Sequence, residues 1–287
     1  MDRIIDQRRK LAAQDYPSIY KNVIEQWNQD GEDAFWLMYA ANYLFRWGGA
    51  RWAIDPLTIA ARIPAKYPLF PTKDFAKCDF LVLTHRHADH LDLQLLKEFS
   101  DLDILWVIPE FLLDELRDSM HLPDRRIIVP KSGEPLEISG IKILPLEGSH
   151  WENHPNGHME GTPNHGVPSF SYLFDVEEKK WFIPGDTRSY DRINAPSLGP
   201  LDGLISHVWL GRRSALIEPP PLLEEFCNYQ LEFDTKRIVL THLDEWGRDE
   251  TDLWTAQHAD LVINNIHEIA PSLPVTYALT GQFVLIS

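Results

Sequence analysis

The sequence predicts an α/β protein, and two observations support this class. Short apolar runs typical of buried strands, such as "FLVLT" at 80–84, alternate with segments whose apolar residues recur at helical spacing. The 287 residues are 44% hydrophobic, enough for a sizeable core, and 24% charged, which does not indicate disorder. We divide the chain into an N-terminal helical extension, 1–32, and a main domain, 33–287.

The sequence pattern changes at residue 34, where long apolar runs replace a polar segment. Residues 1–32 are polar, with apolar residues at helical spacing, and predict one or two helices that pack on the main domain as a cap, a lid or a dimer contact. The stretch "AFWLMYAANYLFRWGGARWAIDP" predicts three strands, because Gly48-Gly49 between apolar runs indicates a hairpin. The third strand ends at Asp55, and a proline-rich loop leads to the buried strand at 80–84.

Strands and helices then alternate. Helices are predicted at 91–99, 110–120 and 250–269, and strands at 103–109, 125–130, 135–139, 141–147, 169–176, 179–186, 201–210, 236–242, 275–280 and 282–287. Residues 149–168 are polar and rich in glycine, proline and histidine, and predict a long loop. "FLVLTH" at 80–85 and "RIVLTH" at 237–242 are nearly identical and are consistent with two similar halves, although six residues are weak evidence for a repeat.

Charge and cysteine content limit the classes of function. The formal net charge of −16 argues against nucleic acid and anionic membrane surfaces as partners. Cys78 and Cys227 do not form a disulfide framework, and they fit a reducing compartment. No apolar leader opens the sequence and no apolar run is long enough to span a membrane, so we expect a cytoplasmic protein without an integral membrane segment. A homo-oligomer is compatible with these features.

The segment "THRHADH" follows the buried strand and gathers four groups that can bind metal: His85, His87, Asp89 and His90. Imidazole is the commonest neutral metal ligand, and a carboxylate adds charge. His85 and His87 are two residues apart and point the same way in an extended segment, so they can share one ion. Asp89 and His90 turn toward the next helix and can reach a second ion. The alternative is a polar loop with hydrogen-bonded histidines, which this density of ligands disfavours.

This segment resembles the signature of the metallo-β-lactamase superfamily, and other markers of that family follow in order. "WAIDP" resembles the early strand that ends in an acidic residue. "LPLEGSH", "FIPGDT" and "VLTHLDEW" resemble the later strand ends that carry ligands. Together these motifs cover about 34–250. The resemblance implies a four-layer αββα sandwich with metals at one edge, preceded here by the N-terminal helices.

The resemblance also implies the ligands of two divalent metal ions. One ion would be held by His85, His87 and His150, the other by Asp89, His90 and His242, with Asp186 as a bridge. Asp55 would orient a ligand by a hydrogen bond. Zinc is the expected metal because the ligands are rich in histidine and lack cysteine, with Mn²⁺ or Fe²⁺ as alternatives. Gly185 before Asp186 lets the backbone turn sharply.

Some assignments remain open in the sequence. The third motif ends at His150, but His165 in the same loop is an alternative ligand, whereas His154 and His158 fit exposed loop positions. His207 either faces the site or is a hydrogen-bonded buried histidine. Arg212 and Arg213 are either an anion anchor or a solvated basic pair. The residues expected to bind substrate are therefore His165, His207, Arg212, Arg213 and Trp151.

These features predict a binuclear metal-dependent hydrolase that cleaves an ester-type bond of a small intracellular substrate with a metal-bridging hydroxide. Asp89 and Asp186 are the expected catalytic residues, with Asp89 or a water that it holds protonating the leaving group. The chain looks most like the branch of ascorbate phosphate lactonases and N-acylphosphatidylethanolamine phospholipases, which favours a lactone or a phosphodiester. The alternatives are a mononuclear iron oxygenase and a catalytically silent metal-binding protein of the same fold.

Overall fold

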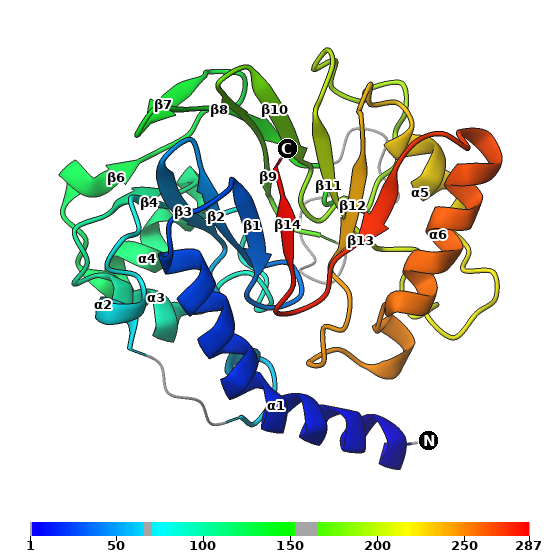
Figure 1. Ribbon diagram of the computed structural model, residues 1–287, viewed down its shortest axis with the longest axis horizontal. Helices are drawn as coiled ribbons and strands as arrows, with labels where there is room; N and C mark the ends of the chain where they lie inside the picture. Colours follow the sequence, from blue (N-terminus) through cyan, green and yellow to red (C-terminus); the bar gives the residue numbers. More distant parts are fainter. Residues whose placement is uncertain (1, 66–69, 153–165, 287) are drawn as a thin grey trace.

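Two seven-stranded sheets lie between two layers of helices in the computed structural model, which describes residues 2–65, 70–152 and 166–286 (Figure 1). The strand order is β14-β1-β2-β3-β4-β5-β6 in the first sheet and β13-β12-β11-β10-β9-β8-β7 in the second. The α/β class and the αββα sandwich predicted from the sequence are confirmed.

The first sheet is built mainly from the N-terminal half of the chain. Its strands are β1 (Ala34–Leu37), β2 (Tyr43–Trp47), β3 (Ala50–Ile54), β4 (Phe80–Val82), β5 (Leu105–Val107), β6 (Ile127–Ile128) and, from the C-terminus, β14 (Phe283–Leu285). The β2–β3 hairpin turns at Gly48 and Gly49, both of which have positive φ, as the Gly-Gly signal predicted. Strands β3, β4, β5 and β6 are parallel.

The second sheet contains β7 (Leu136–Ile138), β8 (Ile141–Glu147), β9 (Phe170–Val176), β10 (Lys179–Ile183), β11 (Gly203–His207), β12 (Ile238–Thr241) and β13 (Val275–Tyr277). Strands β10, β11, β12 and β13 are parallel, and β8 runs in the same direction because β9 is antiparallel to both β8 and β10. Gly203 is required where β11 passes β10, since a Cβ atom there would lie 2.5 Å from the Trp181 ring.

The helices are α1 (Asp2–Asn28), α2 (Pro71–Asp74), α3 (Leu93–Phe99), α4 (Leu113–Met120), α5 (Leu223–Gln230) and α6 (Ala256–Ile269), with short 3₁₀ turns at Ile59–Ala61, Glu110–Leu112, Asp124–Arg126 and Glu250–Asp252. Helix α5 was not predicted, because prolines 219–221 and a short "LLEEFCNYQ" hide its pattern. The helix predicted at 250–269 is instead a 3₁₀ turn followed by α6, which begins at the Thr255 cap.

Three apolar clusters correspond to the spaces between the layers. The cluster between the sheets is rich in stacked rings: Phe45 lies over Trp52 with ring centroids 5.0 Å apart, and Trp52 lies over Phe80 at 5.2 Å. A second cluster joins α1, α3 and α4 to the outer face of the first sheet, and a third joins α5 and α6 to the second sheet. The sandwich is therefore held by apolar burial at every interface.

Helix α1 packs on the first sheet. Trp27 is fully buried, and its indole N–H donates to the Phe45 carbonyl at 2.8 Å. The helix contains Pro17 and changes direction along its length (Figure 1), as expected where a proline removes an intrahelical hydrogen bond. The division into an extension at 1–32 and a catalytic domain at 33–287 stays a prediction.

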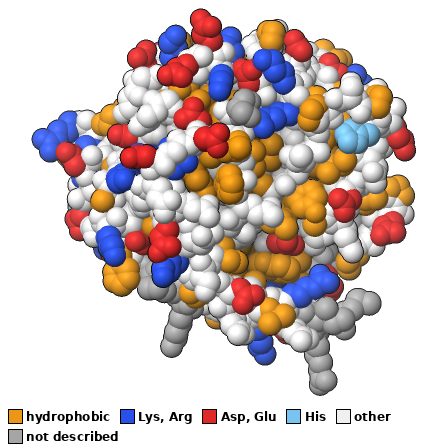
Figure 2. All heavy atoms as spheres, in the orientation of Figure 1, with side chains coloured by type: hydrophobic (Ala, Val, Ile, Leu, Met, Phe, Trp, Pro, Cys, Tyr) orange, Lys and Arg blue, Asp and Glu red, His pale blue; other side chains and the backbone are white. Residues whose placement is uncertain are grey.

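The face seen in Figure 2 carries interspersed acidic and basic side chains with apolar side chains between them. Within the described ranges, none of the helices combines the length and apolar character that crossing a membrane requires.

The direction of the strands places several chain segments at one edge of the sandwich. Asp55 follows β3, His85 follows β4 after two residues, Asp186 follows β10 after two residues, and His242 follows β12. Because carboxyl ends of parallel strands meet at the same edge, residues far apart in the sequence are brought together there.

Candidate metal centre

The "THRHADH" segment forms a tight turn between β4 and α3. The backbone N–H groups of His90 and Leu91 both donate to the His87 carbonyl at 2.9 Å. Asp92 then caps α3 by accepting from the backbone N–H groups of Gln94 and Leu95, each at 3.1 Å. The turn fixes the spacing of its three histidines, because it is anchored by a buried strand at one end and a capped helix at the other.

A first group of ligand atoms is formed by His85, His87, His150 and Asp186, whose candidate ligand atoms lie within 4.8 Å of one another. The His150 ring lies 4.6 Å from both the His85 and His87 rings, centroid to centroid. Asp186 Oδ2 lies 3.9 Å from His85 Nε2 and 3.7 Å from His150 Nε2. Of the two alternatives for the third motif, His150 lies in this group, and His165 lies outside the described residues, as do His154 and His158.

A second group is formed by Asp89, His90, Asp186 and His242, again within 4.8 Å. Asp186 Oδ1 lies 3.2 Å from His90 Nε2 and 3.2 Å from His242 Nδ1. His242 Nε2 lies 3.3 Å from Asp89 Oδ2. His242 has a positive φ of 63°, which turns the chain as it leaves β12.

Asp186 stands between the two groups, because one carboxylate oxygen faces each of them. Gly185 has a φ of 68°, a left-handed conformation that glycine adopts without a steric penalty. This turn directs Asp186 from the end of β10 into the edge of the sandwich, as the sequence suggested.

Burial determines the ionisation of these groups. Burial lowers the pKa of His85 well below its usual value and that of His150 to about 3, so both rings are neutral and able to bind a cation. Burial would raise the pKa of Asp186, but His242 and His90 more than offset it and lower that pKa well below its usual range. The carboxylate between the two groups is therefore ionised.

Asp55 holds His90 and the strand end in place. Its Oδ1 accepts from the Thr84 backbone N–H at 2.8 Å, and its Oδ2 lies 2.8 Å from His90 Nδ1 and 2.5 Å from Thr84 Oγ1. Asp55 also groups with His85 and His90 within 4.8 Å, but these bonds already engage both of its oxygens. Burial would lower the pKa of His90, but Asp186 and Asp55 raise it, so a cation at His90 Nε2 would displace a proton.

His207 is the last residue of β11 and is buried. Its Nδ1 lies 2.8 Å from Asp186 Oδ1, and its Nε2 lies 2.7 Å from the hydroxyl of Tyr43, which also contacts Thr241 Oγ1 at 2.6 Å. Both ring nitrogens are engaged by protein groups, which leaves neither for a substrate. His207 therefore lies at the site as a hydrogen-bonded buried histidine, and its part in substrate binding stays a prediction.

Five ring nitrogens in the two groups are buried and have no hydrogen-bond partner among the described residues: His85 Nε2, His90 Nε2, His150 Nδ1 and Nε2, and His242 Nδ1. Leaving buried polar atoms unpaired costs about 1–3 kcal/mol each, so such atoms require an explanation. Imidazole nitrogens that lack a hydrogen-bond partner and converge on carboxylates suit a divalent cation, which at His90 would displace a proton. The residues present therefore fit two divalent metal ions, and histidine and carboxylate ligands of this kind suit several different metals.

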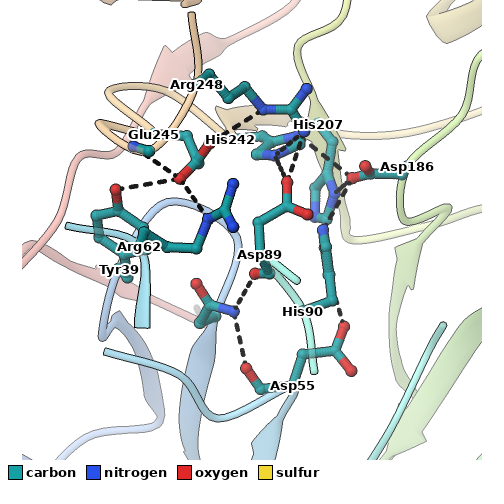
Figure 3. A network of polar contacts seen from close by, with 12 residues as sticks. Tyr39, Asp55, Arg62, Asp89, His90, Asp186, His207, His242, Glu245 and Arg248 are labelled. Carbon is teal, nitrogen blue, oxygen red and sulfur yellow. Dashed lines mark hydrogen bonds and ion pairs between the residues drawn. The ribbon is translucent and has the colours of Figure 1, made fainter. Parts of the chain in front are cut away.

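Arg248 reaches this centre and was not singled out by the sequence. Its Nη2 lies 2.5 Å from Asp89 Oδ2 and 3.3 Å from His242 Nε2, and its Nε lies 3.3 Å from Glu245 Oε2. Figure 3 shows this network continuing from Glu245 to Arg62 and Tyr39. One clue to Arg248 was present in the sequence, because it lies only six residues after His242 in "THLDEWGR". Nothing in the sequence showed that the chain after His242 would turn back and bring Arg248 to Asp89.

A second ionic cluster lies beside the first group. Glu152 is buried and accepts from Arg188 Nη1 at 3.3 Å and from Nε of Arg212 at 3.0 Å, with a further contact to Arg212 Nη2. Arg188 was also missed, although it follows Asp186 by two residues. Both arginines are exposed; Arg212 faces Glu152, whereas the Arg213 backbone N–H contacts Asp252. Trp151 is buried.

The sequence match agrees with this architecture. The Beta-lactamase superfamily domain matches residues 51–244, and the chain belongs to this superfamily in its metallo-β-lactamase form. No curated protein matches the chain.

Solved structures with the same fold have diverse activities. Isothiocyanate hydrolase from Delia radicum gut bacteria aligns with a TM-score of 0.63 and 18% identity over 88% of this chain and 99% of that one. Igni18, a metallo hydrolase from Ignicoccus hospitalis, aligns with a TM-score of 0.61 and 16% identity over 88% and 98%. CmlA, a diiron beta-hydroxylase from Streptomyces venezuelae, aligns with a TM-score of 0.59 and 15% identity over 90% of this chain but only 55% of its own length. At these identities the likeness shows the fold alone.

Proposed function

We propose that this protein is a metal-dependent hydrolase that holds two divalent cations at the edge of the sandwich. The first would be held by His85, His87 and His150, the second by Asp89, His90 and His242, and Asp186 would contact both. The observation that carries this proposal is the position of Asp186, whose two oxygens face the two groups separately. Two sites about 3.5–4 Å apart are typical of binuclear hydrolases.

When bound, two divalent cations supply an activated water nucleophile and polarise the substrate oxygen. The chain's own residues then have distinct tasks. His207 and Tyr43 keep the Asp186 carboxylate oriented, and Asp55 does the same for His90. Asp89 is ionised, because the neighbouring Arg248 cation offsets the effect of burial and lowers its pKa. Asp89 can accept a proton from the attacking water and pass it to the leaving group.

The bond we propose is an ester-type bond, a lactone or a phosphodiester, in a small molecule. Its basis is the resemblance of the long early hairpin and of the "GSHW" and "PGDT" segments to the ascorbate phosphate lactonase and N-acylphosphatidylethanolamine phospholipase branch. The expected zinc, with Mn²⁺ or Fe²⁺ as alternatives, and the cytoplasmic location remain predictions. An iron oxygenase is the second candidate because CmlA shares the fold, and two complete ligand groups weigh against a mononuclear form.

The experiment combines metal analysis with an activity panel. Protein purified with zinc or with manganese is assayed on lactones, phosphodiesters and thioesters. We expect about two ions per chain and turnover of at least one ester class. Bound iron with oxygen-dependent turnover and no ester hydrolysis would support the oxygenase, and metal-free protein with full activity would refute the proposal.

Substitution of the shared carboxylate sharpens this test. Asp186→Asn removes the charge that faces both groups, so we expect metal content to fall below one ion per chain and turnover to fall at least ~100-fold. The matched control is Asp103→Asn, an exposed position in the loop before β5, which should keep both. Wild-type metal content in Asp186→Asn would contradict the role assigned to this residue.

A further inference from the structure

A cavity of about 460 Å³ lies between α1, the segment after the 3₁₀ turn Ile59–Ala61, and the loop after β12. We call it the Arg62 cavity; the lining residues that matter here are Asp6, Arg9, Lys10, Arg62, Ile63 and Trp246. Its volume lies within the range usual for small-molecule sites, about 300–1,000 Å³.

The charge of the Arg62 cavity is opposite to that of the protein. Arg9, Lys10 and Arg62 supply three positive charges, whereas the lining contains one carboxylate, Asp6, in a chain whose formal net charge is −16. Two of these cations are paired, Arg9 with Asp6 at 3.5 Å and Arg62 with Glu245 at 3.0 Å, so among the described residues Lys10 supplies the excess positive charge. A local positive excess in an acidic protein attracts a small anion while the remaining surface repels it.

Arg62 lines the cavity, and its guanidinium is only partly engaged by the protein. Its Nε donates to Glu245 Oε1 at 3.0 Å, and no hydrogen bond from its two Nη groups is found within the described residues. Burial would lower the pKa of Arg62, but Glu245 and then Asp89 raise it, so the guanidinium is charged. The planar donor fork of arginine matches a carboxylate or a phosphate.

A network of ion pairs links the lining of the Arg62 cavity to the metal centre. Figure 3 shows the Arg62 guanidinium between Glu245 and Asp89, and Glu245 continues to Arg248, which contacts Asp89. On the other side, Arg9 Nε donates to the Trp246 carbonyl at 2.7 Å and its Nη2 to the Arg248 carbonyl at 2.6 Å. Helix α1 therefore fixes the loop that carries both Trp246 and Arg248.

We propose that the Arg62 cavity binds the anionic group of the substrate, a carboxylate or a phosphate attached to an apolar portion, and so places the rest of that molecule toward the metal centre. Arg62 and Lys10 provide the positive charge, and Ile63 and Trp246 provide apolar surface. This inference rests on the proposed function, because it takes the anion to be part of the substrate of the hydrolase. Binding of the anion is measured separately, without turnover.

The test measures binding of benzoate, phenylphosphonate and neutral benzamide to metal-loaded protein by calorimetry. We expect the two anions to bind, benzamide to bind at least ~10-fold more weakly, and the stronger anion to identify the group that is recognised. Lys10→Gln should raise the Kd of that anion about three- to tenfold and Arg62→Gln at least as much, as expected for the loss of one cation from a binding site.

The control is Lys97→Gln, an exposed lysine of α3 that does not line the cavity and should leave the Kd unchanged. Lys10 is exposed, so Lys10→Gln gives a result even if Arg62→Gln impairs folding. Anion binding that is insensitive to Lys10 and Arg62, or equal binding of benzamide, would overturn the proposal. Lys10-dependent binding in a protein without hydrolase activity would leave the cavity assignment standing and refute the proposed function instead.

Discussion

At the scale of single residues, the centre depends on buried charges that compensate one another. Asp89, Glu245, Arg62 and Arg248 form a chain of ion pairs in which Glu245 is 1% exposed. Burying a charge costs desolvation free energy, which the attraction of its ion-pair partner offsets. When the partner is removed, the remaining buried charge keeps its desolvation penalty, and the fold is destabilised. Arg248 is the central member, since it contacts both Asp89 and Glu245.

Arg248→Gln should destabilise the fold strongly. It removes the cation shared by two buried carboxylates, so we expect the free energy of unfolding to fall by about 3–5 kcal/mol in urea denaturation. The matched control is Arg117→Gln, whose partner Asp124 is 91% exposed at 3.6 Å, and it should cost under ~0.5 kcal/mol. Equal effects of the two substitutions would show that burial does not govern the Arg248 contacts.

Asp244 provides a prediction about pH. Burial raises the pKa of its carboxyl to about 6 from the usual 3.8. Between these two values the folded protein binds more protons than the unfolded chain, so the free energy of unfolding falls as the pH rises through about 4 to 6. Asp244→Asn removes this fall in the free energy of unfolding, because asparagine does not ionise. The backbone of residue 244 has a positive φ of 54°, which asparagine tolerates well.

We therefore expect Asp244→Asn to raise the Tm by roughly 2–6 °C at pH 7.5, corresponding to about 1–2 kcal/mol after allowance for partial exposure. The difference should disappear near pH 4, where the carboxyl is protonated in the folded protein. Calorimetric scans at both pH values check this, with Asp101→Asn, an exposed position, as the control. A Tm gain that is the same at both pH values would contradict the assigned pKa.

At the scale of elements, α1 is part of the core although it precedes the matched superfamily domain, which begins at residue 51. Tyr16, Val23 and Trp27 are almost fully buried against the first sheet. The apolar spacing in residues 1–32 predicted the helix, but it did not show which residues would reach the loop after β12. Arg9 makes that connection through backbone carbonyls, which carry no sequence signal.

Trp27→Phe tests the attachment of α1. The substitution loses the indole hydrogen bond to the Phe45 carbonyl and leaves space beside Phe75, whose ring lies 5.4 Å from that of Trp27. We expect a loss of about 2–3 kcal/mol in urea denaturation. Leu11→Ala on the exposed side of the same helix should cost under ~0.5 kcal/mol. A similar loss in both variants would mean that α1 packing does not depend on its buried face.

At the scale of the whole molecule, strands of both sheets end at the same edge of the sandwich, and the candidate metal centre is built from residues that follow strands of both. The His85–His90 turn follows a strand of the first sheet, whereas His150, Asp186 and His242 follow strands of the second. Cations bound there would join the two sheets by direct ligation. Metal binding is then also a contribution to stability, because the ligands are assembled only in the folded chain.

Chelation should therefore lower the Tm of the wild-type protein. A ligand at 100 times its Kd adds about 2.7 kcal/mol, which corresponds to roughly 5–10 °C for a chain of this size. Scanning fluorimetry with a chelator, and then with added zinc or manganese, measures the loss and its recovery. The Asp186→Asn variant should respond little to either treatment. A wild-type Tm that is independent of chelator and of metal would argue against structural coupling of the ions.

Much of the fold was predictable because strands and helices differ in apolar period. The "AFWL…AIDP" strands, the Gly48-Gly49 turn and α6 follow local patterns that need no tertiary information. The exceptions have physical reasons: α5 is short and follows three prolines, and the strand predicted at 125–130 forms only at Ile127–Ile128, at a sheet margin. Short elements depend on packing against their neighbours, which a local pattern does not contain.

The sequence by itself determined the α/β class and the "THRHADH" segment at a strand end, because apolar period and ligand density are local properties, and the αββα arrangement was implied by the resemblance to the superfamily. Only the tertiary structure decided which side chains meet. It set His150 beside His85, placed His207 on Asp186, and brought Arg248 and Arg62 to Asp89. These contacts join residues up to 159 positions apart. Their geometry depends on how two sheets pack, which no local pattern in the chain encodes.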